Sequence, residues 1–246
     1  MLQHLINELE YMLHGSTPAV GRLLLFTAVV MFATWAIAYI LIIQKCFREK
    51  TYGVPIIAVC LNISWEAQMA LAPPEYYPWL LKAGNHLWLI PDLFLLFQLY
   101  RFGRANQRHE SVQRHYYVAL TGTLALSFAL VLTFRRYFND DIGVAAAFLL
   151  AFIMSIRFIF MALERPDGSG LSYRAGWLMM IGNIAAAIFC YFWWPMQFAI
   201  GRIDVSLEPT TYWFLYVLFL TVPIFNLIYI LQVRQIRARQ GAAATA

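Results

Sequence analysis

Seven long apolar stretches alternate with short polar segments along the chain. Each stretch is close to the roughly 20 residues that an α-helix needs to cross a bilayer. The segments between them contain Pro, Gly, Asn and Asp residues, which suit water-exposed turns better than lipid-exposed helices. The pattern therefore predicts an all-α fold, a polytopic membrane bundle of seven transmembrane helices, at about residues 19–44, 54–72, 79–101, 116–134, 142–163, 173–199 and 211–233.

No long linker or obvious internal repeat separates these stretches, so we expect residues 1–246 to form a single domain. Residues 1–18 lack a basic leader and contain Glu8 and Glu10, which does not fit a cleavable signal peptide. Their apolar residues are typical of an amphipathic segment that lies on the membrane surface. At the other end, we expect residues 240–246 to form a frayed tail.

The composition indicates a membrane protein rather than a soluble one. Apolar residues make up 61% of the chain and charged residues 13%, whereas soluble domains have about 45–50% and about 25%. The net charge of +5 does not gather on one basic face, so it does not indicate a nucleic-acid partner.

The basic residues predict an orientation. Twelve Lys and Arg residues fall on one side of the predicted helices and five on the other. By the positive-inside rule, the N-terminus is expected outside the cell or in a lumen and the C-terminus in the cytoplasm. We therefore expect a multi-pass integral membrane protein, located in either a bacterial plasma membrane or the endoplasmic reticulum.

Three charged residues lie well inside predicted spans, namely Glu66, Asp92 and Arg157. A charge in the bilayer core costs at least about 2.5 kcal/mol, so each needs a specific explanation. Asp92, Arg157 and Asn226 are expected at one depth, and the simplest interpretation of Asp92 and Arg157 is a buried ion pair. Glu66 lies nearer the outer face, without a cation at its depth. Burial without a partner favours a neutral carboxyl group, so Glu66 is predicted to be protonated and able to donate a proton, the alternative being an interhelical hydrogen bond.

Aromatic residues are the second unusual feature, at 17% of the chain. Trp35 and Trp65 are expected too deep for the interfacial aromatic belt. Beside an acidic proton donor, such rings could line a cavity in which a ring face stabilises a cation, although ordinary packing explains them equally well. The five His and three Cys residues are scattered, so we expect neither a metal site nor a cofactor.

Two sequence blocks resemble a known family. The run KTYGVP at 50–55 is followed by NISWE at 62–66, and this combination resembles the membrane-bound terpene cyclases of meroterpenoid and indole-diterpene pathways. In that family, a basic, Tyr-containing loop and a proline lead into a second helix with an Asn-x-x-Trp-Glu motif. Chain length and the seven spans also agree, as do Trp35, Tyr39, Trp88, Asp92, Gly182 and the loop at 165–172.

The resemblance implies an enzyme, a terpene cyclase of the isomerase or lyase type. Its reaction would be a metal-independent, proton-initiated cyclisation of a prenylated aromatic or indole substrate, with or without an epoxide and without a cofactor. An acid protonates a terminal epoxide or alkene, and the resulting cation closes rings through successive double bonds. The partners implied are this lipophilic small molecule and the membrane lipids.

The family's glutamate in the second helix corresponds to Glu66, but its second essential carboxylate falls at Asn226, three residues before Tyr229. An amide can hold a hydrogen bond but cannot relay a proton. Three alternatives follow: Asp92 replaces the missing carboxylate, the chemistry differs from epoxide opening, or the chain is not a cyclase. The residues expected to act are Glu66, Asp92 and Asn226 as catalytic groups, with Trp65, Asn62, Trp35, Tyr39, Tyr229, Trp88 and Arg157 around the substrate or cation.

A different class of function also fits the buried carboxyl groups. In this alternative, the chain is a non-catalytic seven-helix protein that binds a lipid or solute, or a proton-coupled carrier, with Glu66 and Asp92 as its polar site. Transporters often contain paired repeats with broken helices, and the sequence shows none, which favours the cyclase.

Overall fold

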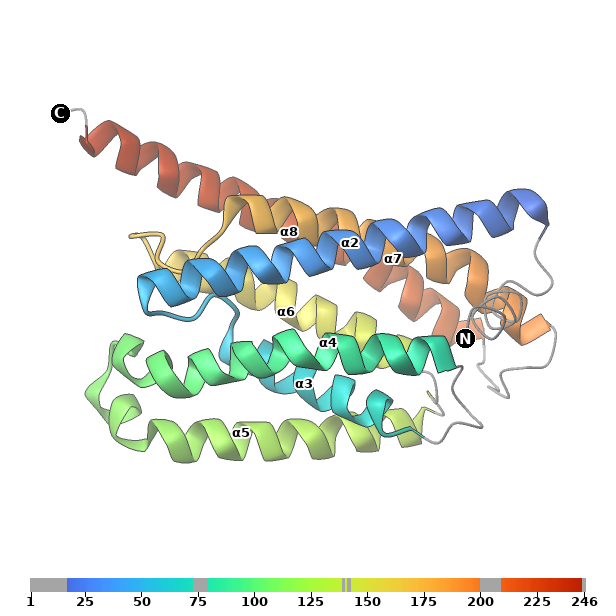
Figure 1. Cartoon of the computed structure of the whole chain (residues 1–246), viewed down its shortest axis with the longest axis horizontal. Coiled ribbons are helices and arrows are strands. Elements are labelled where there is room, and N and C mark those ends of the chain that lie inside the picture. Colours follow the sequence, from blue (N-terminus) through green and yellow to red (C-terminus); the bar gives the residue numbers. More distant parts are fainter. Residues whose placement is uncertain (1–16, 73–78, 139, 141–142, 200–208, 245–246) are drawn as a thin grey trace.

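The computed structural model describes residues 17–72, 79–138, 140, 143–199 and 209–244, and this part of the chain is helical without strands. Residues 1–16 of the predicted surface segment lie outside the described residues. The helices run side by side along the long axis of the molecule (Figure 1). They are α2 (Pro18–Glu49), α3 (Ile56–Ala70), α4 (Trp79–Gln98), η1 (Leu99–Gly103), η2 (Arg104–Asn106), α5 (Glu110–Tyr137), α6 (Val144–Glu164), α7 (Tyr173–Ala199) and α8 (Pro209–Ala244).

Each predicted span coincides with a helix, and the all-helical fold with membrane-length helices is confirmed. Five described helices are long and apolar enough to cross a membrane, namely α2, α5, α6, Tyr173–Trp193 of α7 and Trp213–Ala242 of α8. α3 is a shorter apolar helix of 15 residues. The structure assigns α8 as far as Ala244, and the Gln240 side chain donates a hydrogen bond to the Asp167 carbonyl oxygen at 2.6 Å.

α3 occupies the centre of one half of the bundle. It packs against α4, α5 and α6, while in the other half α2 packs along α7 and α8 packs along both α6 and α7 (Figure 1). Because α3 has neighbours on several sides, most of its side chains are buried, including the polar residues Ser64, Glu66 and Gln68. The placement of α3 therefore decides which polar groups meet inside the bundle.

A short connection sets the direction of α3. α2 ends at Lys50 in the left-handed conformation, with φ at 51°, and α3 begins after Pro55. Arg165 ties this connection to the loop between α6 and α7, since its Nη1 donates to the carbonyl oxygens of Tyr52 at 2.6 Å and Ser169 at 3.0 Å. The Arg165 guanidinium carbon also lies 4.2 Å from the centre of the Tyr52 ring, as in a cation–π contact. The KTYGVP block thus fixes the start of α3.

The other end of α3 is anchored at the connection between α5 and α6. Trp65 Nε1 donates to the Gly143 carbonyl oxygen at 2.9 Å. Asp140 accepts hydrogen bonds from the backbone amides of Ala145 at 3.2 Å and Ala146 at 2.7 Å, which caps the first turn of α6. Burial raises the pKa of the Asp140 carboxyl group, and these amides act in the opposite direction. This carboxyl group is therefore committed to a helix cap.

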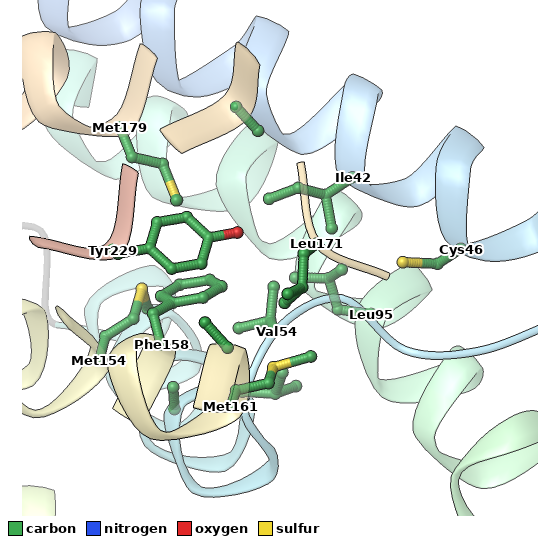
Figure 2. Packing of buried hydrophobic residues seen from close by; sticks show 14 of the residues in the cluster. Ile42, Cys46, Val54, Leu95, Met154, Phe158, Met161, Leu171, Met179 and Tyr229 are labelled. Carbon is green, nitrogen blue, oxygen red and sulfur yellow. The ribbon is translucent and has the colours of Figure 1, made fainter. Parts of the chain in front are cut away.

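The largest apolar cluster among the described residues takes side chains from all seven α-helices, and Figure 2 shows the part that lies around Tyr229 and Phe158. Near its centre the Tyr229 ring packs on Phe158, with ring centroids 5.0 Å apart, close to Met154 and Met179. Inside a bilayer, where lipid tails are as apolar as the side chains, helices associate through close van der Waals packing of this kind. This packing holds α8 against α6 and α7 and so fixes the position of Asn226, one helical turn before Tyr229.

Candidate active site

Asp92 lies at the junction of α2, α3 and α4, with 1% of its surface exposed. Tyr39 Oη donates to Asp92 Oδ1 at 2.9 Å, and Asn62 Nδ2 donates to Asp92 Oδ2 at 2.7 Å. Asn62 Nδ2 also donates to Tyr39 Oη at 3.0 Å. Both carboxyl oxygens therefore accept hydrogen bonds, an arrangement that makes a buried negative charge tolerable.

Glu66 lies one helical turn beyond Asn62, on the same face of α3. It is 7% exposed, and its Oε2 atom is buried and has no hydrogen-bond partner among the residues that the structure describes. Asp92 and Tyr39 are close enough to interact with Glu66 electrostatically. Buried polar atoms are nearly always paired, so an unpaired carboxyl oxygen calls for a functional explanation. Tyr39, Asn62, Glu66 and Asp92 are called the polar cluster below.

Aromatic rings pack beside the polar cluster. The Tyr39 ring centroid lies 5.9 Å from that of Trp35 and 5.6 Å from that of Trp88. Trp88 in turn lies 4.8 Å from Phe32. Phe32 is missing from the sequence prediction, although its spacing of three and seven residues from Trp35 and Tyr39 places it on their face of α2. Gly182 of α7 approaches this group so closely that a Cβ atom there would lie 2.5 Å from Trp35 Cδ1.

The structure thus brings six of the ten predicted site residues together, namely Trp35, Tyr39, Asn62, Glu66, Trp88 and Asp92. Trp65 is placed elsewhere. It packs against Leu61, Val131 and Leu150, on the side of α3 that meets α5 and α6. Its ring and its hydrogen bond to Gly143 hold α3 in place.

The predicted ion pair between Asp92 and Arg157 is wrong. Arg157 is half-buried on α6, and its guanidinium carbon lies 5.7 Å from the centre of the Phe160 ring. α3 packs against both α4 and α6, and hydrogen bonds from α2 and α3 already occupy both Asp92 oxygens. Equal depth in the membrane therefore did not make the two residues neighbours.

Asn226 and Tyr229, both on α8, have other hydrogen-bond partners, Ser155 on α6 and Ser172 just before α7, and are called the second polar group. Ser155 Oγ donates to Asn226 Oδ1 at 3.0 Å, whereas Asn226 Nδ2 is buried and finds no hydrogen-bond partner in the described part of the chain. Tyr229 Oη accepts a hydrogen bond from the Ser172 amide at 3.3 Å. Within the described ranges, no hydrogen bond joins this group to the polar cluster. The sequence prediction missed Ser155, because a single Ser in an apolar helix gives no sign of its partner.

The polar cluster has the parts needed for acid chemistry on an apolar molecule. It places a buried carboxyl oxygen without a partner beside a second carboxyl group that is held by two donors. The neighbouring aromatic rings can stabilise a positive charge. In the part of the chain that the structure describes, no group of three or more His, Cys, Asp or Glu side chains is arranged to hold a metal ion.

Comparisons with known proteins point to one family. The family model of the Pyr4-like transmembrane terpene cyclases matches residues 18–235. Terpene cyclase macJ of Penicillium terrestre is 31% identical over 174 residues, which cover 67% of this chain and 66% of the relative, just under two thirds of its length. Pyr4-family terpene cyclase mfmH of Annulohypoxylon moriforme is 25% identical over 70% of this chain and 73% of the relative, and terpene cyclase pyr4 of Aspergillus fumigatus is 24% identical over 67% and 70%. No solved structure matches the chain.

Proposed function

Since the chain belongs to the Pyr4-like transmembrane terpene cyclases, we propose that it cyclises a prenylated aromatic or indole substrate without a metal ion, by proton transfer from Glu66. A membrane-embedded terpene cyclase suits a lipophilic substrate that enters from the bilayer. The observation that carries the proposal is the buried Glu66 Oε2 atom, which has no hydrogen-bond partner although the nearby Asp92 has two donors.

The two carboxyl groups have different roles in this proposal because their surroundings differ. Hydrogen bonds from Tyr39 and Asn62 stabilise the ionised form of Asp92. Among the described residues, no group donates a hydrogen bond to Glu66 Oε2, and Glu66 lies near that negative charge, so in this proposal a proton shared by the pair resides on Glu66. Glu66 is therefore the general acid, and Asp92 supplies the negative charge that stabilises the cation.

The proposed reaction is an isomerisation in which Glu66 donates a proton and later receives one. A proton from Glu66 adds to a terminal epoxide oxygen and one C–O bond breaks, which leaves a hydroxyl group and a carbocation. Successive double bonds attack the cation and close rings, and the last cation loses a proton to the Glu66 carboxylate, so substrate and product have the same mass. An epoxide oxygen is a stronger base than an alkene carbon, so an epoxide demands less of a lone carboxylic acid.

Asp92 takes the role of the family's second carboxyl group in this proposal, because this chain has Asn226 at the position where the family has a carboxylate. It lies within electrostatic reach of Glu66, and Tyr39, one of its donors, belongs to the group of aromatic rings. Asn226 is instead joined to Ser155, and its amide nitrogen faces no partner. In this proposal Asn226 and Tyr229 form part of the wall around the substrate, and Asn62 positions Asp92.

We also propose a single domain of seven transmembrane helices, with α3 and α4 completing the five helices of membrane length. The excess of Lys and Arg at the C-terminal end of α2, in η1 and η2, and in the C-terminal half of α8 supports a cytoplasmic C-terminus and a lumenal N-terminus. The named relatives are fungal, which favours the endoplasmic reticulum over a bacterial plasma membrane.

The proposal can be tested by incubating membranes that contain the wild-type protein with a prenylated aromatic compound, in epoxidised and in non-epoxidised form. We expect a product of unchanged mass and shifted retention in chromatography with mass spectrometry. Glu66→Gln should abolish it at wild-type protein levels, whereas Glu164→Gln, which changes an exposed glutamate on α6, should not. An active Glu66→Gln variant would contradict the assignment. No isomerisation of either form, together with solute-dependent proton flux in proteoliposomes, would favour a carrier.

A further inference from the structure

A groove at one end of the bundle lies apart from the polar cluster. Its lining residues lie at the C-terminal end of α2, on α4, and on η1 and η2. The C-terminal ends of α2 and α4 lie at the end of the bundle where α8 also finishes (Figure 1). Its volume is about 530 Å³, and it is lined by Phe47, Lys50, Phe97, Arg101, Phe102 and Ala105. The groove thus combines three aromatic rings with two cations.

The rings form one continuous apolar surface. The Phe47 ring centroid lies 6.1 Å from that of Phe97 and 6.0 Å from that of Phe102. Phe47 and Phe97 are among the exposed large apolar side chains of the molecule. In a chain that spans a membrane, such exposed rings contact acyl chains rather than water.

Lys50 and Arg101 carry the charge of the groove. Neither forms an ion pair within the described ranges, where the ion pairs are Lys45 with Glu49 and Arg114 with Glu110. The Arg101 guanidinium carbon lies 5.7 Å from the centre of the Phe102 ring, so this cation lies beside the apolar surface. The groove therefore has an uncompensated positive charge at its edge.

The backbone beside the groove has an unusual conformation and makes close contacts with neighbouring segments. η1, which carries Arg101, is a π-helical turn, a rare conformation that is frequently found at functional sites. Gly103 at its end approaches Tyr116 so closely that a Cβ atom would lie 1.8 Å from Tyr116 Oη. Asn106 Nδ2 donates to the Lys50 carbonyl oxygen at 3.1 Å, which ties the end of α2 to η2. The last contact joins the backbone at Lys50 to the segment that follows Arg101.

A second pocket at this end of the bundle has a different character. It is smaller, about 290 Å³, and its lining includes the acidic residues Glu49 and Asp167 beside Lys45 and Arg237. Its two acidic and two basic side chains balance, so this pocket does not favour binding of an anion. Of the two pockets, the groove with the three rings is the one that suits a molecule with an anionic head and an apolar tail.

We propose that this groove binds an anionic phospholipid. The phosphate contacts Lys50 and Arg101, and an acyl chain lies along the three rings. The groove lies where membrane-spanning helices end, which is the depth of lipid headgroups, and basic pockets at this depth bind acidic headgroups. The groove shares no residue with the polar cluster, so a test of lipid binding does not depend on the role of Glu66.

Native mass spectrometry of protein in nanodiscs of phosphatidylcholine with a minor fraction of phosphatidylserine tests this proposal. The wild type should release from the nanodisc with bound phosphatidylserine. Replacing both groove cations, Lys50→Gln with Arg101→Gln, should lower its retention by about tenfold to thirtyfold. The matched control is Arg234→Gln with Arg239→Gln, which removes two exposed cations of α8 and should leave retention unchanged.

Two further arms identify the ligand. Phe97→Ala keeps both cations and should still weaken retention, because it removes part of the surface for the acyl chain. Glycerol phosphate, which lacks acyl chains, should not compete. Equal loss in both double variants would show a diffuse electrostatic effect and would overturn the site, and competition by glycerol phosphate would show a simple phosphate site instead of a lipid site.

Discussion

Asn62 Nδ2 lies 2.7 Å from Asp92 Oδ2, and this hydrogen bond joins the helix that carries Glu66 to the helix that carries Asp92. The same amide nitrogen donates to Tyr39 Oη, which itself donates to Asp92 Oδ1. The three side chains close a small network in which Asp92 is the acceptor at the centre. Glu66 remains outside this network, and this difference separates the proposed acid from the proposed anion.

Asn62→Leu removes a donor to Asp92 while keeping a similar volume. A hydrogen bond to a charged group contributes about 1.5–3 kcal/mol, so we expect kcat to fall by about tenfold to a hundredfold. Because Asn62 acts through Asp92, KM should change little. The control is Gln68→Leu, another buried amide of α3, whose Nε2 donates to the Phe128 carbonyl oxygen. It should lower thermal stability without a matching loss of kcat per folded protein; equal kcat losses in both variants would argue against a positioning role.

Asp92→Asn keeps the shape of the side chain and removes its charge. We expect turnover to fall by about a hundredfold or more, because about 3 kcal/mol of charge stabilisation at the cation is lost. Asn226→Asp should change turnover by less than about threefold, because Ser155 can still donate to the new carboxyl group and Asp92 already supplies the charge. A large gain in turnover for Asn226→Asp, with little loss of turnover for Asp92→Asn, would show that position 226 and not Asp92 is the place of the second carboxyl group.

The sequence predicts much of the polar cluster, because Asn62 and Glu66 are one turn apart on one helix and therefore share a face. Trp65 shows the limit of this reasoning. It is adjacent to Glu66 in sequence, but consecutive residues point about 100° apart around a helix, and its ring faces α5 and α6.

Depth along the membrane normal was also a weak guide to contacts. Asp92 and Arg157 were expected at one depth, yet their contact depends on which helices are neighbours and how each is rotated, and α3 packs against both helices that carry them. The helices themselves were predictable because long apolar runs are strong local signals. The pairing of Ser155 with Asn226 also depends on which helices are neighbours and how each is rotated, so the sequence alone does not predict it.

Gly182→Ala introduces a Cβ atom 2.5 Å from Trp35 Cδ1 and 2.8 Å from Thr34 Oγ1. The Trp35 ring and α7 must move apart, and overpacking of this kind costs about 1–3 kcal/mol. We expect lower turnover and a changed ratio of products, because the rings beside the cation shift. Gly122→Ala on α5, where no atom lies within 4 Å of the added Cβ, serves as the control and should leave both unchanged. An unchanged product ratio in Gly182→Ala would remove Trp35 from the proposed wall.

Chelation tests the proposed independence from metal ions. A proton from Glu66 supplies the electrophile in our proposal, so turnover in the presence of excess EDTA should equal that in its absence. Activity should be measured on membranes washed with EDTA before substrate is added. Loss of turnover that Mg²⁺ restores would contradict the proposed chemistry.

Infrared difference spectroscopy of the carboxyl C=O stretch tests the central claim most directly, since a protonated carboxyl group shows this band and an ionised carboxylate does not, while lipid ester bands do not shift in D₂O. The resting wild type should show a band that shifts in D₂O. The band should disappear in Glu66→Gln, which should also be inactive, and persist in Asp92→Asn. A band that persists in Glu66→Gln and disappears in Asp92→Asn would place the proton on Asp92 and contradict the assignment of Glu66 as the acid.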